Sequence, residues 1–321
     1  MNLIQVAKEL GTDEQCLDYL EKQRWPEGVR CLICGSDKVS RITRQTASKN
    51  KRTRVYECLE PSCHQQFSPT AGTIFHDSHL PLTKWFMALA LITNAKKGIS
   101  AKQVQRDLKV GYQTAWYLCH RIRKAMEEKD GGLLSGTVEI DETYVGGKAR
   151  RKKNKYKIKD CVVGMVERGG KVRFRHLGKG SATSQAIGPI IEANVSSDVE
   201  RVITDESVIY PFGLPKEFLP KHETIMHARE YVRGDVYTNT IESAFSLLKR
   251  GIVGQFHKVS IRHLPRYLAE FEYRFNRRDE QEEMFGETVR RMVKTDKMPF
   301  RQLVLEAKRG RPHYSLEPSS D

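Results

Sequence analysis

Four cysteines with metal-ligand spacing carry the most recognisable chemistry in this chain. Two residues separate Cys31 from Cys34, and Cys58 and Cys63 form a second pair further along. Two thiolate pairs on short loops suit tetrahedral zinc, with one pair on each loop. The second pair has a four-residue gap in place of the usual two, so His64 is kept as an alternative to Cys63. The spacing predicts a structural zinc ribbon.

Two other uses of these cysteines are less consistent with the sequence. An iron–sulfur cluster also binds thiolates, but the small strand-rich insert between the pairs favours a structural zinc site. Disulfides are disfavoured because nothing in the sequence suggests export. The three remaining cysteines also occupy positions typical of a core: Cys16, Cys119 and Cys161.

Two aspartates lie in strand-like apolar segments. Asp141 follows Val138-Glu139-Ile140, and Asp205 ends Val202-Ile203-Thr204. A carboxylate among apolar neighbours needs a compensating group, and a divalent cation is one. Spacing alone does not select these two, because three nearby glutamates compete for the same role: Glu139, Glu142 and Glu206.

A helical segment starting at residue 239 supplies a third acid. At about 100° per residue, Asn239, Glu242 and Lys249 fall on one polar stripe beside an apolar one. Two strand carboxylates and one helix carboxylate can hold two Mg²⁺ ions about 4 Å apart, which stabilises both oxygens in a phosphodiester displacement. Lys249 would then contact a phosphate.

Two helices with a short connection precede the acidic segments. Ser100 is placed to cap a helix that ends at Leu108, Gly111 marks a turn, and a second helix is expected over residues 113–128. This outline matches a helix-turn-helix, whose second helix enters the major groove of DNA, although many such helix pairs bind no DNA. Three basic side chains lie off the apolar stripe of the second helix and are expected to contact DNA: Arg121, Arg123 and Lys124.

The composition favours a polyanionic partner. Lys and Arg number 55 against 40 Asp and Glu, for a net charge of +15, which suits nucleic acid. The longest apolar stretch, near residues 85–92, is too short to span a bilayer, and the N-terminus lacks a signal-peptide pattern. We therefore expect a cytoplasmic protein that binds double-stranded DNA and no membrane.

These segments predict an α/β chain with four parts. An N-terminal helix and the zinc ribbon occupy residues 1–75, and the helix-turn-helix region occupies residues 76–132. Alternating strand patterns begin after the glycine pair at 131 and 132, so a mixed α/β unit is expected over residues 133–280. Residues 281–321 form a C-terminal helical extension and tail.

Several longer segments carry a family resemblance. They are residues 67–76, 81–86, 138–147, 239–242 and 271–277. Together they resemble bacterial insertion-sequence transposases with an N-terminal zinc ribbon and a DDE-type catalytic domain. The resemblance runs from about residue 15 to residue 280. It implies a ribonuclease H-like fold, a mixed sheet flanked by helices.

The resemblance also implies roles for individual residues. Asp141 and Asp205 match the first two catalytic acids, and Glu242 lies 37 residues after the second. Lys249 matches a basic position seven residues later. Some relatives have an asparagine where others have the last acid, so Asn239 is the rival of Glu242. A carboxylate is the better Mg²⁺ ligand, because an amide oxygen contributes no charge.

The implied activity is DNA strand cleavage by metal-activated water, followed by attack of the freed 3′-hydroxyl on target DNA. Mg²⁺, or Mn²⁺ in its place, is the implied catalytic cofactor. The ribbon and the helix-turn-helix would bind the terminal inverted repeats of the element, with strong salt dependence. Pairing two ends implies a homo-oligomer, associated with the nucleoid. A basic run after the first catalytic strand is expected either to hold DNA or to be a solvated loop: Arg150, Arg151, Lys152 and Lys153.

Two other functions fit part of this pattern. A transposase-derived DNA-binding protein would keep the ribbon and helices without catalysis, and the apparently complete set of acids argues against it. A ribonuclease H-like nuclease or resolvase would cut branched or hybrid nucleic acid without transposing. Terminal inverted repeats flanking the gene would distinguish a transposase from such a nuclease.

Overall fold

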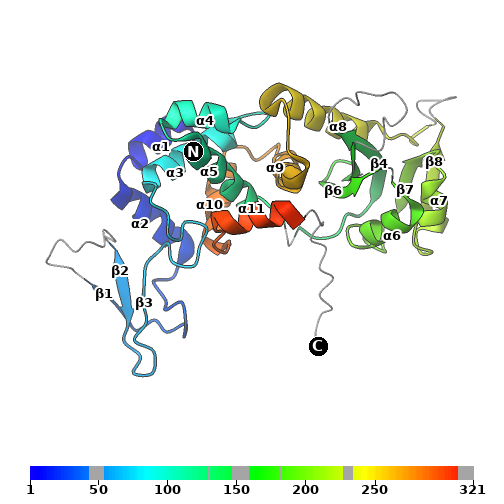
Figure 1. The fold of residues 1–321 in the computed structure, drawn as a ribbon. Helices are drawn as coiled ribbons and strands as arrows, with labels where there is room; N and C mark the ends of the chain where they lie inside the picture. The colour runs from blue at the N-terminus through cyan, green and yellow to red at the C-terminus, as the bar shows by residue number, and fades with distance from the viewer. Residues whose placement is uncertain (43–53, 129–130, 147–158, 181, 227–233, 310–321) are drawn as a thin grey trace. The chain divides into compact units, whose positions relative to one another are not determined.

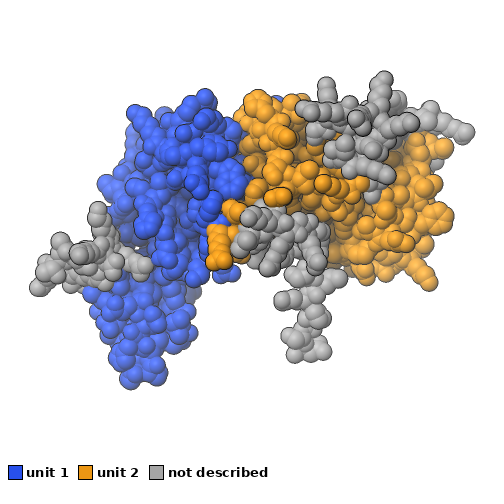
Figure 2. Space-filling model, in the orientation of Figure 1, with its two compact units in different colours: residues 1–126, 279–300 blue, residues 127–278, 301–321 orange. Residues whose placement is uncertain are grey.

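The computed structural model describes residues 1–42, 54–128, 131–146, 159–180, 182–226 and 234–309, with the side chains of residues 305–309 not described. The chain divides into two compact units, shown in blue and orange in Figure 2. Unit 1 comprises residues 1–126 and 279–300, and unit 2 comprises residues 127–278 and 301–321. The basic residues Arg150, Arg151, Lys152 and Lys153 lie outside the described residues, so the DNA contact expected of them stays a prediction.

Unit 1 opens with two short helices, α1 (Leu3–Glu9) and α2 (Asp13–Arg24). Thr12 caps α2, because its hydroxyl accepts a hydrogen bond from the backbone N–H of Gln15 and the Gln15 side chain bonds back to Thr12. The helix ends before Pro26. The sequence predicts one N-terminal helix, whereas the structure has two.

The zinc-ribbon segment is a small antiparallel sheet, with β1 (Val39–Ile42), β2 (Val55–Cys58) and β3 (Gln66–Phe67) in that order. Its small apolar core contains the rings of Trp25, Tyr56 and Phe67, whose centroids lie 5.8–6.4 Å apart. Arg54, which is buried at the start of β2, makes ion pairs to three carboxylates of α2: Glu14, Asp18 and Glu21. The ribbon is thereby attached to the first long helix.

Helices α3 (Leu82–Asn94), α4 (Ala101–Leu108), α5 (Tyr112–Ala125) and α10 (Met284–Lys294) complete unit 1. The Ser100 hydroxyl caps α4, and Gly111 precedes α5, so the expected helix, turn and helix are present. The turn uses Lys109 in the left-handed conformation, with φ +50°. Helix α10 returns from the far end of the sequence, and Phe285 packs against Tyr19 and Phe86. Helix α11 (Phe300–Arg309) follows.

Two of the three basic residues expected to face outward from α5 are buried, so the prediction is wrong for these two. Arg121 is 5% exposed and Arg123 is 1% exposed. Arg121 lies between the rings of Trp85 and Tyr117, and Arg123 donates to the Ile99 carbonyl. The long side chains of arginine are largely apolar, so both can be buried although they lie on a helix stripe of polar residue types. Lys124 is half-buried and remains a candidate for phosphate contact.

Unit 2 is built on one mixed sheet of five strands. They are β4 (Thr137–Val145), β5 (Asp160–Glu167), β6 (Val172–Lys179), β7 (Arg201–Asp205) and β8 (His222–Ile225), in the order β6-β5-β4-β7-β8. The first three are antiparallel neighbours, whereas β7 is parallel to β4 and β8 is parallel to β7. The α/β architecture predicted from the sequence is therefore confirmed.

Helices cover both faces of this sheet (Figure 1). Helices α6 (Ser184–Glu192) and α7 (Ile209–Gly213) pack on one face, in a core with β4 residues Val138 and Ile140. Helices α8 (Asn239–Gly251) and α9 (Leu264–Asn276) pack on the other face, in a core with Val162, Val166 and Phe174. Short helical turns occupy Leu219–Lys221, Ile252–Phe256 and Ile261–His263. No helix in the described part of the chain is long and apolar enough to cross a membrane.

Candidate metal centres

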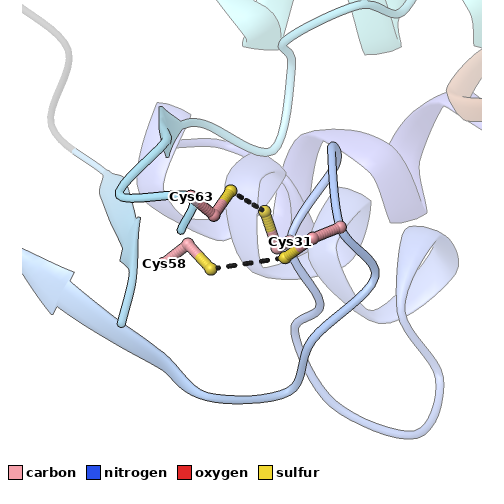
Figure 3. A group of neighbouring side chains, drawn as sticks. Cys31, Cys58 and Cys63 are labelled. Atoms are coloured by element: carbon pink, nitrogen blue, oxygen red, sulfur yellow. Dashed lines mark hydrogen bonds between the residues drawn. The ribbon is translucent and has the colours of Figure 1, made fainter. Parts of the chain in front are cut away.

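The four predicted cysteine ligands converge in unit 1. The sulfur atoms of Cys31, Cys34, Cys58 and Cys63 all lie within 4.8 Å of one another. The Cys31 and Cys63 sulfurs are 3.7 Å apart, and the Cys34 and Cys58 sulfurs are 3.5 Å apart; Figure 3 labels Cys31, Cys58 and Cys63. Zn–S bonds of about 2.3 Å at tetrahedral angles place sulfurs about 3.8 Å apart. The two printed separations are close to this value, so the cluster has the size and the ligand set that a zinc ion needs.

Backbone turns aim the thiols of the first pair. The Cys31 N–H donates to the Ser36 carbonyl, and the Gly35 N–H donates to the Cys31 carbonyl, with Gly35 at φ +74°. Hydrogen bonds from the backbone N–H groups of Cys34 and Ile33 lower the pKa of Cys31 to about 6. A thiol that ionises readily suits a zinc ligand, which binds as the thiolate.

The wider gap of the second pair holds an extra turn. The N–H groups of Cys63 and His64 both donate to the Glu60 carbonyl, and the Glu60 carboxylate accepts a hydrogen bond from Ser36 in the first loop. This turn keeps Cys63 in the cluster. His64 adopts φ +44°, is exposed, and is not in the group of converging ligands. The four-cysteine assignment therefore fits better than the one with His64.

The acidic residues are gathered on the sheet of unit 2. Strands β4 and β7 are parallel, with Thr137 opposite Arg201 and Glu139 opposite Ile203. Continuing this register by two residues brings Asp141 and Asp205 opposite each other, where β7 ends. Each accepts a hydrogen bond from a nearby backbone N–H, Asp141 from Glu142 at 2.7 Å and Asp205 from Ser207 at 3.0 Å.

Helix α8 approaches the sheet beside Asp141 because of a glycine. Gly164 on β5 is the antiparallel partner of Asp141. A Cβ atom at Gly164 would lie 2.6 Å from the Phe245 ring and 2.7 Å from the Cδ1 atom of Ile241. Because Gly164 has no side chain, Ile241 and Phe245 of α8 pack directly on β5. Ile241 is the sequence neighbour of Glu242.

Glu139 attaches the first turn of α8 to β4. Its carboxylate is fully buried and accepts hydrogen bonds from the N–H groups of Thr240 (2.8 Å) and Ile241 (3.0 Å), and from the Thr240 hydroxyl (2.9 Å). These N–H groups lack partners within the helix, and a carboxylate there also interacts favourably with the helix dipole. Glu139 therefore holds the helix start rather than facing a metal.

Arg168 completes this contact. Its Nε donates to Glu139 at 2.7 Å, and its two terminal nitrogens donate to the carbonyl oxygens of Asp235 and Tyr237. The guanidinium carbon lies 3.7 Å from the centroid of the Tyr237 ring. The buried charge of Glu139 is compensated, and the chain leading into α8 is fixed by the same arginine.

The carboxylates affect one another electrostatically. Burial, and then the negative charges of Glu142, Asp205 and Glu242, raise the pKa of Asp141 to about 7, against one opposing backbone hydrogen bond. Asp141, Asp205 and Glu242 therefore share one electrostatic environment, and Glu142 belongs to it as well, since burial and then the charge of Asp205 raise the pKa of Glu142. Glu242 also accepts a hydrogen bond from the Thr238 hydroxyl at 3.3 Å.

The rival residues differ in their contacts and exposure. The Tyr210 hydroxyl donates to Glu142 at 2.6 Å, and Glu206 is exposed. Asn239 and Lys249 are exposed on α8, as their polar stripe predicts. In the described part of the chain, the four cysteines are the one group of three or more possible metal ligands whose ligand atoms converge. The acids are therefore less tightly gathered than the thiols.

Sequence reasoning missed the part played by Glu139, Arg168 and Gly164. Glu139 was considered only as a metal ligand. The available signal was the i, i+2 spacing of Glu139 and Asp141, which puts both side chains on one face of the strand. A glycine within the apolar strand at residue 164 was the signal for a close approach by another element.

The geometry defines a class of protein: a four-cysteine zinc ribbon in one unit and an acidic cluster on a mixed α/β sheet in the other. Comparison with known sequences identifies both parts. The ISXO2-like transposase domain matches residues 133–276, and the transposase zinc-ribbon domain matches residues 11–66. Residues 133–276 are therefore identified as a transposase domain with a ribonuclease H-like fold, and residues 11–66 as a transposase zinc ribbon.

A curated relative supports the same assignment. The chain is 28% identical over 284 residues to the uncharacterized protein in transposable element ISH50 of Halobacterium salinarum. The match spans 83% of this chain and 92% of that protein. The zinc-ribbon match and the cysteine cluster together support a structural Zn²⁺ ion.

Proposed function

We propose that the protein is an active DNA transposase that cuts and joins the ends of an insertion sequence. The observation that carries this proposal is the electrostatic cluster of Asp141, Asp205 and Glu242 on adjacent elements of unit 2. The family match supports the same chemistry. We assign Asp141, Asp205 and Glu242 as the Mg²⁺ ligands.

Each group of residues has its own role in the proposed reaction. The three carboxylates hold the cations, and Glu139, Arg168 and Gly164 fix Glu242 relative to the strands. When bound, two Mg²⁺ ions, or Mn²⁺, supply an activated oxygen nucleophile and neutralise charge on the phosphate. Lys249, exposed two turns after Glu242, contacts the DNA backbone. The proposal assigns Lys124 and the basic segment at residues 150–153 to DNA contacts as well.

The reaction is two successive phosphodiester displacements. Water attacks phosphorus at the element end, the bond to the 3′-oxygen breaks, and a 3′-hydroxyl and a 5′-phosphate are released. That 3′-hydroxyl then attacks a phosphorus of the target strand, displaces the target's own 3′-oxygen and joins the two DNAs. No covalent bond to the protein forms. The zinc ribbon and the α4–α5 pair recognise the terminal inverted repeats, and more than one subunit brings two ends together on the nucleoid.

The test uses a duplex carrying the element's terminal repeat, a target duplex and Mg²⁺. We expect both strand cleavage and strand joining. Cleavage without joining would instead identify a nuclease or resolvase, and binding without cleavage would identify a DNA-binding derivative.

The third ligand is tested by comparing Glu242→Gln with Asn239→Ala in the same assay. We expect Glu242→Gln to abolish both steps and Asn239→Ala to retain most activity, because the amide adds no charge to a metal site. Retention of activity by Glu242→Gln together with loss in Asn239→Ala would transfer the assignment to Asn239.

A further inference from the structure

Unit 1 contains a cavity of about 500 Å³ at the start of helix α5. One wall is the loop of residues 76–80, another is the first two turns of α5, and a third is residues 297–300. A cavity of this size is larger than a phosphate needs and falls in the range that holds small organic ligands, about 300–1,000 Å³. The proposed activity leaves this cavity unexplained.

Arg121 lines the cavity with an uncompensated charge. The side chain is 5% exposed, and its guanidinium carbon lies 4.7 Å from the Trp85 ring centroid and 5.0 Å from that of Tyr117. One terminal nitrogen donates to the His76 carbonyl at 3.3 Å, but the buried Nε has no hydrogen-bond partner. Within the described residues, no carboxylate forms an ion pair with Arg121.

A buried guanidinium in this condition favours an anion. Burial lowers the pKa of Arg121, which reflects the free-energy cost of keeping the charge away from water. A phosphate would supply both the opposite charge and acceptors for the free N–H groups, since the planar fork of arginine matches phosphate oxygens. The one carboxylate among the lining residues, Asp77, is 3.3 Å from the Nε2 atom of His76.

The other lining groups add positive charge and aromatic surface. Lys297 lies exposed at the edge of the cavity, and the Tyr117 and Phe300 rings meet edge-on with centroids 5.5 Å apart. Helix α5 begins there without a side-chain cap, and Gln113 and Thr114 of its first turn line the cavity. Uncapped N–H groups at a helix start favour anions. Aromatic faces accept a nucleobase regardless of its identity.

We propose that this cavity binds a single nucleotide unit, with its phosphate against Arg121 and its base against Tyr117 and Phe300. The nucleotide comes either from an element end, where one unpaired residue turns out of the duplex, or from free nucleotide. The first source rests on the proposed transposase function. In this proposal, Arg121 of α5 binds the nucleotide in the cavity and does not contact the major groove.

The test uses the full zinc-loaded chain. Binding is measured by fluorescence anisotropy for two labelled duplexes of the terminal repeat, one fully paired and one with a single unpaired terminal nucleotide. Thymidine monophosphate and inorganic phosphate are titrated as competitors. We expect tighter binding of the unpaired duplex. The monophosphate should abolish this preference at lower concentration than phosphate, because phosphate lacks the base.

Two variants test the cavity, and a third variant serves as the control. Arg121→Gln should remove the preference for the unpaired nucleotide, with about tenfold or greater weakening of monophosphate binding. Lys297→Glu, at an exposed position, should reduce the same preference and serves as the test if Arg121→Gln fails to fold, as judged by zinc content and melting temperature. Arg106→Gln removes an exposed arginine of α4 and should affect both duplexes equally.

The outcomes separate the cavity from the catalytic proposal. Equal weakening of both duplexes by Arg121→Gln would make Arg121 a general phosphate contact and overturn the nucleotide site. An unchanged preference in both variants would also overturn it, even if cleavage and joining are normal. Monophosphate binding that depends on Arg121 in a chain without strand transfer would support the cavity while the transposase proposal fails.

Discussion

The zinc ribbon and the acidic centre gather ligands in opposite ways. In the ribbon, two short loops bring four sulfurs within 4.8 Å, and backbone N–H groups of the same loops orient them. In unit 2, the candidate ligands come from β4, β7 and α8, which are separated by long stretches of sequence. Their relative placement depends on a glycine and a buried ion pair that hold no metal.

This difference matches the two kinds of metal use that we propose for the chain. A structural zinc site is closed by its four protein ligands, and its binding energy is also folding energy. A catalytic site keeps positions for substrate and water, so its ligands cannot be satisfied by one another. The raised pKa of Asp141 reflects the cost of burying this carboxylate and, after that, of holding it close to other acids.

The largest expected effect concerns the closed site. Cys58→Ser should remove zinc and unfold the ribbon, because apparent zinc binding in such modules is worth on the order of 10 kcal/mol. Zinc analysis measures the loss of the metal, and limited proteolysis between residues 30 and 70 measures the unfolding of the ribbon. Unit 2 of the same variant should keep its fold. His64→Ala is the matched control and should keep its zinc. Normal zinc content in Cys58→Ser would show that the ribbon is not closed by these four thiols.

Removing one acid should abolish catalysis without unfolding the protein. Asp205→Asn keeps the shape of the side chain but removes a metal-binding charge, so strand cleavage should fall by at least about 10³-fold. Zinc content and the circular dichroism spectrum should be unchanged. The adjacent Glu206→Gln is the control and should retain activity. Retained activity in Asp205→Asn together with lost activity in Glu206→Gln would show that Glu206 is the ligand.

The contact at the start of α8 should have an intermediate effect. In Glu139→Gln, one N–H of α8 loses its acceptor and Arg168 loses its ion-pair partner, so Glu242 is less well placed. We expect kcat to fall about 10- to 100-fold, with little change in DNA affinity and with a higher Mg²⁺ requirement.

A neighbouring glutamate serves as the control for this variant. Glu167→Gln changes a residue of β5 whose carboxylate bonds to Ser135 and not to α8. Its Mg²⁺ requirement should match that of the wild type. An unchanged Mg²⁺ requirement in Glu139→Gln would mean that the contact stabilises the fold without positioning Glu242.

The smallest effect is on stability. Asp141 has a pKa of about 7 in the folded protein against an ordinary 3.8, so its contribution to stability is greatest below pH 3.8 and is lost as pH rises to about 7. In Mg²⁺-free protein, Asp141→Asn should raise the free energy of unfolding by about 1–3 kcal/mol at pH 8, and the difference should shrink toward pH 4. Denaturant unfolding followed by circular dichroism across this range measures it. A wild type that is more stable than the variant at pH 8 would contradict the cause given for the pKa.

Local patterns predicted the ligands and most of the elements. The cysteine spacing, the capping residue Ser100, and the strands that carry Asp141 and Asp205 all depend on neighbours in sequence. The parts that escaped prediction depend on distant contacts. Glu139 meets α8 across a separation of 101 residues. Arg121 and Arg123 are buried because other segments cover a helix face that periodicity alone marks as exposed.

The return of α10 to unit 1 has a consequence for how the protein is made. Phe285 packs against Tyr19 and Phe86, so residues near both ends of the sequence share one apolar cluster. A nascent chain therefore exposes that cluster until synthesis has passed residue 294, after the strands of unit 2 have been translated. Internal deletions or truncated copies that end before α10 would leave the first unit incomplete and dependent on chaperones, even though they retain every residue of the ribbon.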